Sequence, residues 1–405
     1  MVNQLFKSLY HYLRRADIIL WLLLAAISAY SLVLLKSVSR SSSVDYFHAQ
    51  LFPLVLGVAG AIIVSTMDYA DIAGLWYLIE GFCVFLMIYT YFFGERIQGA
   101  GGVDARAWIR IGGRTFQSSE LVKIAFMLTF AKHLDILNKR GRIEEPIQVI
   151  LLAFHAALYV LLCVLQGDMG AAMVFFSMFI VMSLSAGVQL RYFAILAGLI
   201  VICLPIMWRY VMSDYQKQRF VAVFNLDRDP DLRMGDGYQQ WQGRISIGSG
   251  RFRGQGLFQG SRVSSNVVTF QQSDYIFSVA GEELGFIGCS LIILLLLLFM
   301  LKVLHVANTS RDDLGRYMCF GFFGMIALQA IWNIGMCLVI LPVMGLTLPF
   351  FSAGGSSSMC LYLGFGLVQS VHMRRKEIDG LHLKRESPLR FSSKQLKRVR
   401  EYKKL

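Results

Sequence analysis

The sequence carries little charge for its length. Only 16% of its 405 residues are Asp, Glu, Lys or Arg, whereas 56% are hydrophobic. Soluble domains average about 25% charged residues. Several apolar runs also approach the ~20 residues that a helix needs to cross a bilayer. This composition excludes a mainly soluble protein and predicts a polytopic membrane protein without a large separate soluble domain.

Cysteine is also scarce, and its placement argues against disulfides and structural zinc. No CxxC pair occurs, and no cysteine lies in an aqueous loop. We therefore expect the cysteines to act as small packing residues inside the membrane. The seven cysteines are Cys83, Cys163, Cys203, Cys289, Cys319, Cys337 and Cys360.

Ten apolar runs predict an all-α fold of about ten transmembrane helices. The first run has no clear cleavage site and further spans follow it, so we predict a signal anchor rather than a removed signal peptide. The runs lie near residues 17–35, 51–67, 72–93, 119–137, 147–166, 169–187, 190–212, 276–302, 317–341 and 350–372.

The basic residues of the short loops predict the orientation, because cytoplasmic loops are enriched in Lys and Arg. They place both termini in the cytoplasm. We expect a single transmembrane domain over 1–372 and a basic cytoplasmic tail over 373–405. The net charge of +13 is densest in that tail, directly after the last span. This distribution favours anchoring to anionic membrane lipids over nucleic-acid binding.

Two long loops are predicted outside the cell although they carry several arginines. They cover residues 94–118 and 213–275, the second between helices 7 and 8. Long loops escape the positive-inside bias, so tolerated charge is one interpretation. The other is an extracytoplasmic pocket in which Arg side chains bind an anion. The arginines recur among glycines and aromatic residues rather than in solvated runs, which favours the pocket.

Glycine recurs every few residues in the second loop, between Gly235 and Arg262. A flexible linker is one interpretation. The stretch also contains Tyr238, Trp241 and Phe252, which are too apolar for a solvated linker. A folded loop at the membrane surface is therefore favoured.

Polar side chains mark the starts of three predicted helices. Glu120 and Lys123 are three residues apart and can pair on one helix face, which would also be a purely structural role. Asp168 follows span five and can cap span six or face a pocket. Ser356 begins a run of three serines that can cap the last span, or open a helix start that attracts anions.

Three carboxylates, Asp274, Glu282 and Glu283, precede a long apolar run. A charged side chain at the centre of a spanning helix costs roughly 2.5–3.5 kcal/mol on insertion scales, so acids near this depth suggest a function. Asp274 could instead cap the eighth span. For Glu282 and Glu283 we expect capping or pairing within the bundle.

Taken together, these motifs resemble those of the SEDS family (shape, elongation, division and sporulation), the RodA/FtsW-type peptidoglycan glycosyltransferases. The resemblance covers nearly the whole chain. The stretches that carry it are ARAWIRIGGRTFQSSELVKIA, LQGDMGAAMV, GYQQWQGRISIGSGRFRGQGL, SDYIFSVAGEELGFIG and LPVMGLTLPFFSAGGSSS. It implies a ten-helix enzyme of the bacterial cytoplasmic membrane that polymerises lipid II on the outer face, usually with a class B penicillin-binding protein.

The resemblance also implies roles for individual residues. The family's essential aspartate falls on Asp274, its paired Glu and Lys on Glu120 and Lys123, and the aspartate of its Asp-Leu-Gly motif on Asp168. We expect Asp274 to be the general base that activates a sugar hydroxyl. A divalent cation, Mg²⁺ or Mn²⁺, is the one cofactor under consideration, beside basic side chains that balance the pyrophosphate. The predicted substrate-binding residues are Arg106, Trp108, Arg110, Gln117, Glu120, Lys123, Asp168, Gln239, Arg244 and Ser356.

The chain departs from the family pattern shortly before Asp274. The family usually has Leu-Pro-Glu there, whereas this chain has Val268, Thr269 and Phe270. This chain therefore has no second acid at that position to serve the reaction, a metal or a partner protein. The MDYAD stretch after span two and the short N-terminus are more typical of RodA than of FtsW, which favours a role in cell elongation and shape.

Two other functions fit a ten-span protein with polar outer loops. One is a flippase that moves lipid II across the bilayer, and the other is a scaffold that only holds partner proteins. Transporters place ionisable residues near the midplane and are often built from repeats, which are not visible here. The acids and arginines of this chain instead gather near the predicted outer face, which favours the enzyme. A division or sporulation role within the same family also stays open.

Overall fold

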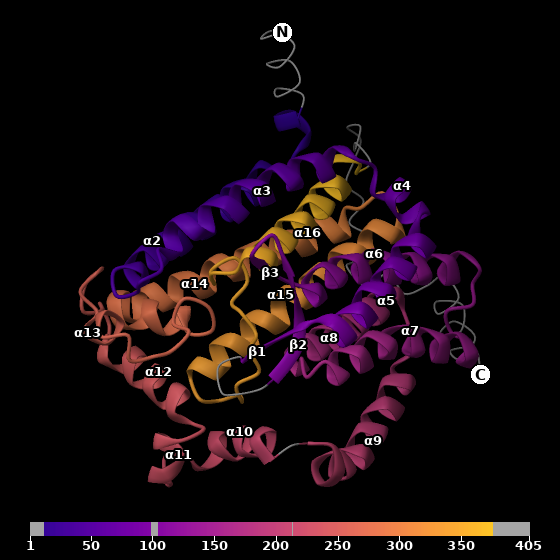
Figure 1. Ribbon diagram of the computed structural model, residues 1–405. Coiled ribbons are helices and arrows are strands. Elements are labelled where there is room, and N and C mark those ends of the chain that lie inside the picture. The colour runs from indigo at the N-terminus through magenta and orange to yellow at the C-terminus, as the bar shows by residue number, and fades with distance from the viewer. Residues whose placement is uncertain (1–11, 99–103, 213, 376–405) are drawn as a thin grey trace, which may run out of the picture. The chain divides into compact units, whose positions relative to one another are not determined.

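The computed structural model describes residues 12–98, 104–212 and 214–375. In this part of the chain each of the ten predicted spans falls on a long helix (Figure 1). These helices are α2 (Ile18–Ser39), α3 (Tyr46–Thr66), α5 (Trp76–Phe93), α6 (Ser118–Lys139), α7 (Pro146–Leu165), α8 (Met169–Ala186), α9 (Leu190–Ile206), α14 (Ile276–Asn308), α15 (Asp313–Cys337) and α16 (Gly355–Met373).

Eight of the long helices in the described part are long and apolar enough to cross a membrane. The remaining two, α6 and α16, carry more polar residues. Both are largely buried by their neighbours, so their polar side chains face protein rather than lipid. The chain is thus an all-α, multi-pass membrane protein, and the total of ten spans and the position of both termini stay predictions.

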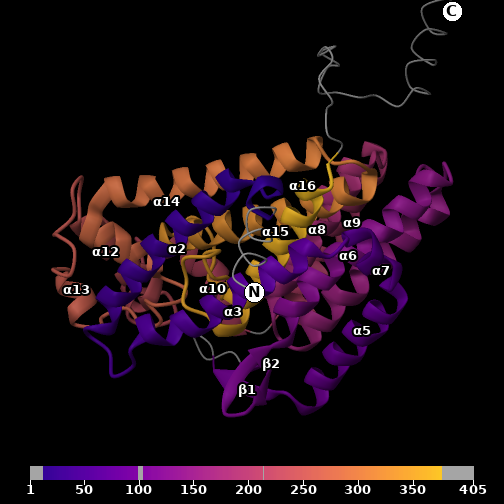
Figure 2. The ribbon, with the colours of Figure 1, turned by 90° about the horizontal axis from the view of Figure 1, so that it is seen from above.

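The first long loop forms a small antiparallel sheet, which the sequence analysis did not predict. Its strands are β1 (Glu95–Gln98), β2 (Asp104–Ile111) and β3 (Arg114–Gln117), in the order β1-β2-β3. Gly112 and Gly113 join β2 to β3 with φ angles of 57° and 80°. A two-residue hairpin turn with both φ positive is the type that matches strand twist. The sheet lies at the end of α5, where Figure 2 shows β1 and β2.

The second long loop is folded, so the flexible-linker interpretation is wrong. It contains α10 (Asp214–Asn225), α11 (Pro230–Met234), α12 (Tyr238–Ser249) and α13 (Ser261–Ser264). Helix α12 packs against α14 and α15. Its glycines allow that approach, since a Cβ on Gly243 would lie 2.9 Å from the Tyr275 ring.

Helix α14 is interrupted at Gly285, which has φ 65° and ψ −155°. The loop after α12 hydrogen-bonds to the interrupted turn. The N–H of Phe286 donates to the Arg251 carbonyl at 2.9 Å, and the N–H of Gly256 donates to the Glu283 carbonyl at 3.0 Å. Backbone groups freed by the break are therefore paired with the glycine-rich loop, as the interior of a membrane protein requires.

Gly254 in this loop should tolerate no side chain. It has φ 80°, and a Cβ there would lie 2.0 Å from the Glu283 carbonyl oxygen. We expect Gly254→Ala to lower the free energy of unfolding by at least about 2 kcal/mol, because both the backbone conformation and the space oppose it. The thermal unfolding midpoint of the purified protein measures this. Gly248→Ala is the control, since nothing lies within 4 Å of its added Cβ; equal midpoints for both variants would contradict the prediction.

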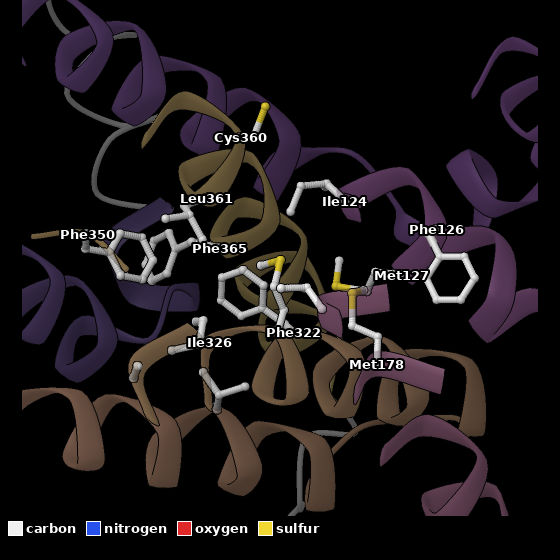
Figure 3. Packing of buried hydrophobic residues seen from close by; sticks show 14 of the residues in the cluster. Ile124, Phe126, Met127, Met178, Phe322, Ile326, Phe350, Cys360, Leu361 and Phe365 are labelled. Atoms are coloured by element: carbon white, nitrogen blue, oxygen red, sulfur yellow. The ribbon is translucent and has the colours of Figure 1, made fainter. Parts of the chain in front are cut away.

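The core lies where α6, α8, α15 and α16 meet. Figure 3 shows Phe322 of α15 between Phe365 of α16 and Met127 of α6. Gly364 makes room for that ring, because an added Cβ would lie 2.5 Å from it. Small residues at helix contacts are the usual way in which membrane helices approach closely.

The predicted tail begins inside the bundle. Arg374 donates to the carbonyls of Ser65 and Thr66 at 3.1 and 2.6 Å and pairs with Asp68 at 3.3 Å, so it covers the end of α3. The rest of the predicted tail, from 376, lies outside the described residues. Its proposed contact with anionic lipid stays a prediction.

Candidate active site

Asp274 lies two residues before the start of α14 and does not cap it. The residue at the N-cap position is Tyr275, without a side-chain capping bond, so the capping interpretation of Asp274 is wrong. The backbone carbonyl of Asp274 accepts a hydrogen bond of 2.8 Å from Asn333 of α15. Its side chain is only 8% exposed. The carboxyl group is thus held in place through its backbone and is free of a structural bond to the helix.

Burial raises the pKa of Asp274 to about 6, against the opposing effects of the Ser273 side chain and the Arg219 guanidinium. Burial disfavours the ionised form of a carboxyl group. A pKa near 6 leaves the group mostly ionised at pH 7 and gives it more proton affinity than an ordinary aspartate. Both properties suit a general base.

Arg219 is the site residue that the sequence analysis did not single out. It lies on α10, and one of its guanidinium nitrogens donates to the Val343 carbonyl at 2.9 Å. It acts electrostatically on Asp274, which is 55 positions later in the chain. Arg219 is one of several basic residues in the long loop, and no local motif distinguishes it from the others. Only the fold identifies it.

A second group of site residues surrounds Asp168. Its Oδ1 accepts the N–H of Ala171 at 2.9 Å and so caps α8. Its Oδ2 accepts from Gln117 Nε2 at 2.7 Å and from the Ser119 hydroxyl at 3.2 Å. Asp168 therefore caps α8, as one of the two interpretations predicted, and the same carboxyl group also binds Gln117, another predicted site residue.

Glu120 and Lys123 form the predicted pair on α6. Lys123 Nζ lies 2.7 Å from Glu120 Oε1, and the two side chains are 1% and 9% exposed, respectively. The pairing predicted from their spacing is confirmed. A buried pair of this kind fixes both side chains, because either charge alone would be costly.

The segment that leads into α16 joins the region of Asp274 to the group around Asp168. The Ser352 hydroxyl donates to the Ser273 carbonyl, next to Asp274. Four residues later, the Ser356 hydroxyl accepts the N–H of Gln117 at 3.3 Å. Ser356 does not cap α16, whose N-cap is Gly354 without a side-chain bond. Ser356 instead connects α16 to the strand that carries Gln117.

Strand β2 carries three predicted substrate-binding residues at every second position: Arg106, Trp108 and Arg110. Side chains alternate along a strand, so these three share one face. The intervening Ala107 is buried.

The two described arginines of β2 are held in different ways. Arg110 pairs with Glu95 of β1 at 3.0 Å, whereas Arg106 is fixed through its backbone N–H, which donates to the Gln166 carbonyl at 2.9 Å. Arg96 and Arg114 of the same sheet have side chains outside the described part.

Gln239 and Arg244 stabilise the second loop. Gln239 makes two bonds with Thr269, donating to its hydroxyl at 2.9 Å and accepting from its N–H at 2.8 Å. Arg244 forms a bidentate pair with Asp227 and lies against the Trp241 ring. Thr269 belongs to the stretch that departs from the family pattern. The stretch 268–270 is therefore fixed to α12 through Gln239.

Glu282 and Glu283 both have structural partners. Glu282 Oε1 accepts the N–H groups of Arg262 at 2.6 Å and Val263 at 3.4 Å, at the start of α13. Glu283 accepts from the Ser37 hydroxyl of α2. The expected capping or pairing within the bundle is what these contacts provide. The Asp274 carboxyl group instead interacts with the Ser273 side chain and, electrostatically, with Arg219 of α10.

Metal-ligand clusters are not found in the part of the chain that the structure describes: no three His, Cys, Asp or Glu side chains converge there. Magnesium is often held by one or two carboxylates together with substrate phosphates. The described residues thus fit a divalent cation only where a substrate brings most of its ligands.

Comparison with known proteins agrees with this arrangement. The family model for FtsW, RodA and SpoVE, described as a cell cycle protein, matches residues 14–377. A probable peptidoglycan glycosyltransferase FtsW of Geobacter metallireducens is 31% identical, over 93% of this chain and 99% of the relative. The peptidoglycan glycosyltransferase MrdB of Escherichia coli K12 is 30% identical, over 88% of this chain and 94% of the relative.

Two solved structures have the same fold. A chain of a peptidoglycan synthase complex superposes with a TM-score of 0.73 at 29% identity, covering 89% of this chain and 99% of that chain. The rod shape determining protein RodA of Thermus thermophilus superposes with a TM-score of 0.66 at 28% identity, covering 89% and 98%. The chain belongs to the FtsW/RodA/SpoVE family, the SEDS proteins.

Proposed function

We propose that this protein is a peptidoglycan glycosyltransferase that polymerises lipid II, with Asp274 as its general base. The enzyme class rests on relatives of that name, about 30% identical over most of the chain. The observation that carries the residue assignment is the buried Asp274 carboxyl group, which has a raised pKa and does not cap α14. Perturbed carboxyl groups of this kind concentrate at functional sites.

The reaction needs one base and a way to neutralise charge. The acceptor sugar hydroxyl gives its proton to Asp274 as its oxygen bonds to the anomeric carbon of the donor. The bond from that carbon to the lipid pyrophosphate breaks, and the pyrophosphate leaves with the electron pair. Pyrophosphate is a stable leaving group that needs no proton. One carboxylate therefore suffices, unlike the two used in glycoside hydrolysis.

Basic side chains near Asp274 and near Asp168 would neutralise the negative charge of the pyrophosphate. Arg219 is the first candidate because it acts electrostatically on Asp274. Arg106 is the second, because it shares a face of β2 with Trp108 and Arg110. Arg110 and Arg244 pair with Glu95 and Asp227. Lys123 is fully buried against Glu120, so we assign it a positioning role. A divalent cation at the pyrophosphate would supply further charge neutralisation, held mainly by the substrate itself.

We further propose a class B penicillin-binding protein as the partner and cell elongation in the bacterial cytoplasmic membrane as the role. The solved chain with a TM-score of 0.73 comes from a complex described as coordinating polymerization and crosslinking, which supports a crosslinking partner. The MDYAD stretch supports the elongation subgroup. Asp68 of that stretch pairs with Arg311 at 3.0 Å and with Arg374, so it links the end of α3 to the turn before α15 and to the end of α16.

The purified protein should convert lipid II into glycan strands. We would incubate it in detergent with lipid II, with and without a class B partner inactivated in transpeptidation, and separate the glycan products on a gel. Polymer in the presence of the partner is the expected result. Liposomes that hold only this protein provide the second arm, in which movement of labelled lipid II across the bilayer is followed. Lipid movement without polymer in either arm would identify a flippase and overturn the proposal.

A further inference from the structure

An apolar cavity of about 170 Å³ lies between α7, α8 and α9. Its lining includes Val149 and Ala153 of α7, Phe179 of α8 and Leu196 of α9. These residues lie in the first half of α7, the second half of α8 and the first half of α9. The cavity is thus at the end of the bundle where α6 finishes, whereas Gln117 and Asp168 mark the opposite end.

The size and chemistry of the cavity fit a hydrocarbon chain. Dry apolar cavities of about 150 Å³ take up benzene or xenon, so this space is large enough for several methylene groups. A helix with its side chains is about 10–12 Å across and cannot enter it. An acyl chain can, because it is narrow and flexible.

Helix α9, which forms the third wall of the cavity, is not covered by another helix in the described residues. Helix α9 contains no buried residue, and it stands at the edge of the bundle in Figure 1. Protein contacts in the described part therefore do little to fix α9 against α7 and α8. A lipid chain between them would supply the missing packing, since a void leaves its lining atoms without contacts.

The cavity has one polar group in its lining, the Ser183 hydroxyl, and a cation nearby, Arg191, which together suit a phospholipid. Ser183 lines the cavity, is 1% exposed, and its hydroxyl has no hydrogen-bond partner among the described residues. It lies one turn before the end of α8, about where a glycerol ester would sit below a headgroup. Arg191, at the start of α9, is exposed, and its guanidinium lies 3.2 Å from the hydroxyl of Tyr192, which lines the cavity.

The charge at this end favours an anionic headgroup. Basic residues outnumber acidic ones in the α6–α7 connection and at the start of α9, where Lys139, Arg140, Arg142 and Arg191 stand against Glu144 and Glu145. Lys139 is paired with Asp135 of α6 at 2.8 Å. Each Lys or Arg near a negative membrane surface contributes about 1 kcal/mol of attraction. Arg142 is already paired with Glu145 at 2.8 Å, which leaves Arg191 as the better placed cation.

We propose that this cavity binds one acyl chain of an anionic phospholipid, with an ester oxygen accepting from Ser183 and the phosphate on Arg191. The lipid belongs to the leaflet at the basic end of the bundle. It is distinct from the lipid-linked sugar substrate, whose reacting groups are at the Asp274 end. The proposal does not depend on the reaction that the protein catalyses.

Native mass spectrometry of the full chain in lipid-free detergent tests this site. The protein would be titrated with phosphatidylglycerol, with phosphatidylcholine, and with an undecaprenyl pyrophosphate lipid. Leu196→Trp and Ala153→Phe fill the cavity from its two sides, and the α9 variant carries little folding risk because α9 has no buried residue. Ala197→Phe is the matched control, an exposed position on the same helix outside the lining.

Wild type and Ala197→Phe should retain one phosphatidylglycerol, and both filling variants should bind it at least about tenfold more weakly. Arg191→Gln should remove most of the preference for phosphatidylglycerol over phosphatidylcholine, whereas Arg15→Gln, an exposed arginine before α2, should keep it. Equal retention by wild type and Leu196→Trp would overturn the proposal. Equal binding of the two phospholipids by wild type would also overturn it. A third contradicting result is that the undecaprenyl lipid displaces phosphatidylglycerol from wild type but not from Leu196→Trp, because the cavity would then bind the undecaprenyl lipid.

Discussion

Asp274→Asn should reduce lipid II polymerisation at least ~100-fold, because a positioned general base contributes about 10²–10⁴-fold to a rate. Asparagine has the same shape but cannot accept the hydroxyl proton. The contact that anchors this residue uses its backbone carbonyl, which accepts from Asn333. The substitution should therefore remove the base without moving the segment.

Gel analysis of the glycan products at equal protein concentration checks this result. Asp236→Asn is the matched control, since Asp236 is an exposed aspartate of the same loop; its rate should equal that of wild type. Asp274→Asn enzyme that polymerises within a few-fold of wild type would move the base to another residue.

The same variant should be more stable than wild type at neutral pH. The pKa of Asp274 rises from 3.8 to about 6 in the folded protein, so the folded state binds this proton more tightly than the unfolded state. The free energy of unfolding therefore falls as the pH rises between these two values, by about 3 kcal/mol once both are exceeded. Asn carries no such cost. A loss of activity with a gain of stability would exclude misfolding as the cause.

Lys123→Met should lower the free energy of unfolding by about 3–5 kcal/mol, since it leaves the buried Glu120 charge without its partner. The double variant Glu120→Gln with Lys123→Met should recover most of that loss, because removing both charges of a buried pair is often neutral. Arg142→Met breaks an exposed pair and is the matched control, with little change expected.

Thermal unfolding of the purified variants, combined with the polymerisation assay, separates stability from positioning. If the pair positions Gln117 and Asp168 for substrate, the double variant should be stable yet slow. A double variant with wild-type rate would show that the pair is purely structural. A stable single variant would contradict the burial argument itself.

The sequence predicted the long helices well because each is an apolar run long enough to be detected without tertiary information. It also predicted the Glu120–Lys123 pair, since residues three apart on a helix always share a face. Helices α6 and α16 were harder to recognise as membrane spans, because they carry polar residues that neighbouring helices rather than water satisfy. The interruption of α14 at Gly285 was missed, since it depends on a loop some thirty residues earlier in the chain.

The candidate site could be predicted only in part. The resemblance supplied Asp274, Asp168 and Gln117, and the structure brings the last two into contact. Arg219 was not predicted, because only the fold brings α10 near Asp274. Arg110 and Arg244 were predicted as anion ligands from their place among glycines and aromatic residues in the long loops. Their pairing with Glu95 and Asp227 depends on strand register and loop folding, which the sequence does not show.

The pH dependence of polymerisation tests most directly whether Asp274 is the general base. Initial rates would be measured from pH 4.5 to 8 at low lipid II concentration, where they report the free enzyme. Since the ionised carboxylate is the active form, the rate of wild type should rise about tenfold per pH unit below a midpoint near pH 6 and level off above it. The residual rate of Asp274→Asn should lack this midpoint. A wild-type profile that is flat across pH 6, or a variant that keeps the same midpoint, would contradict the assignment.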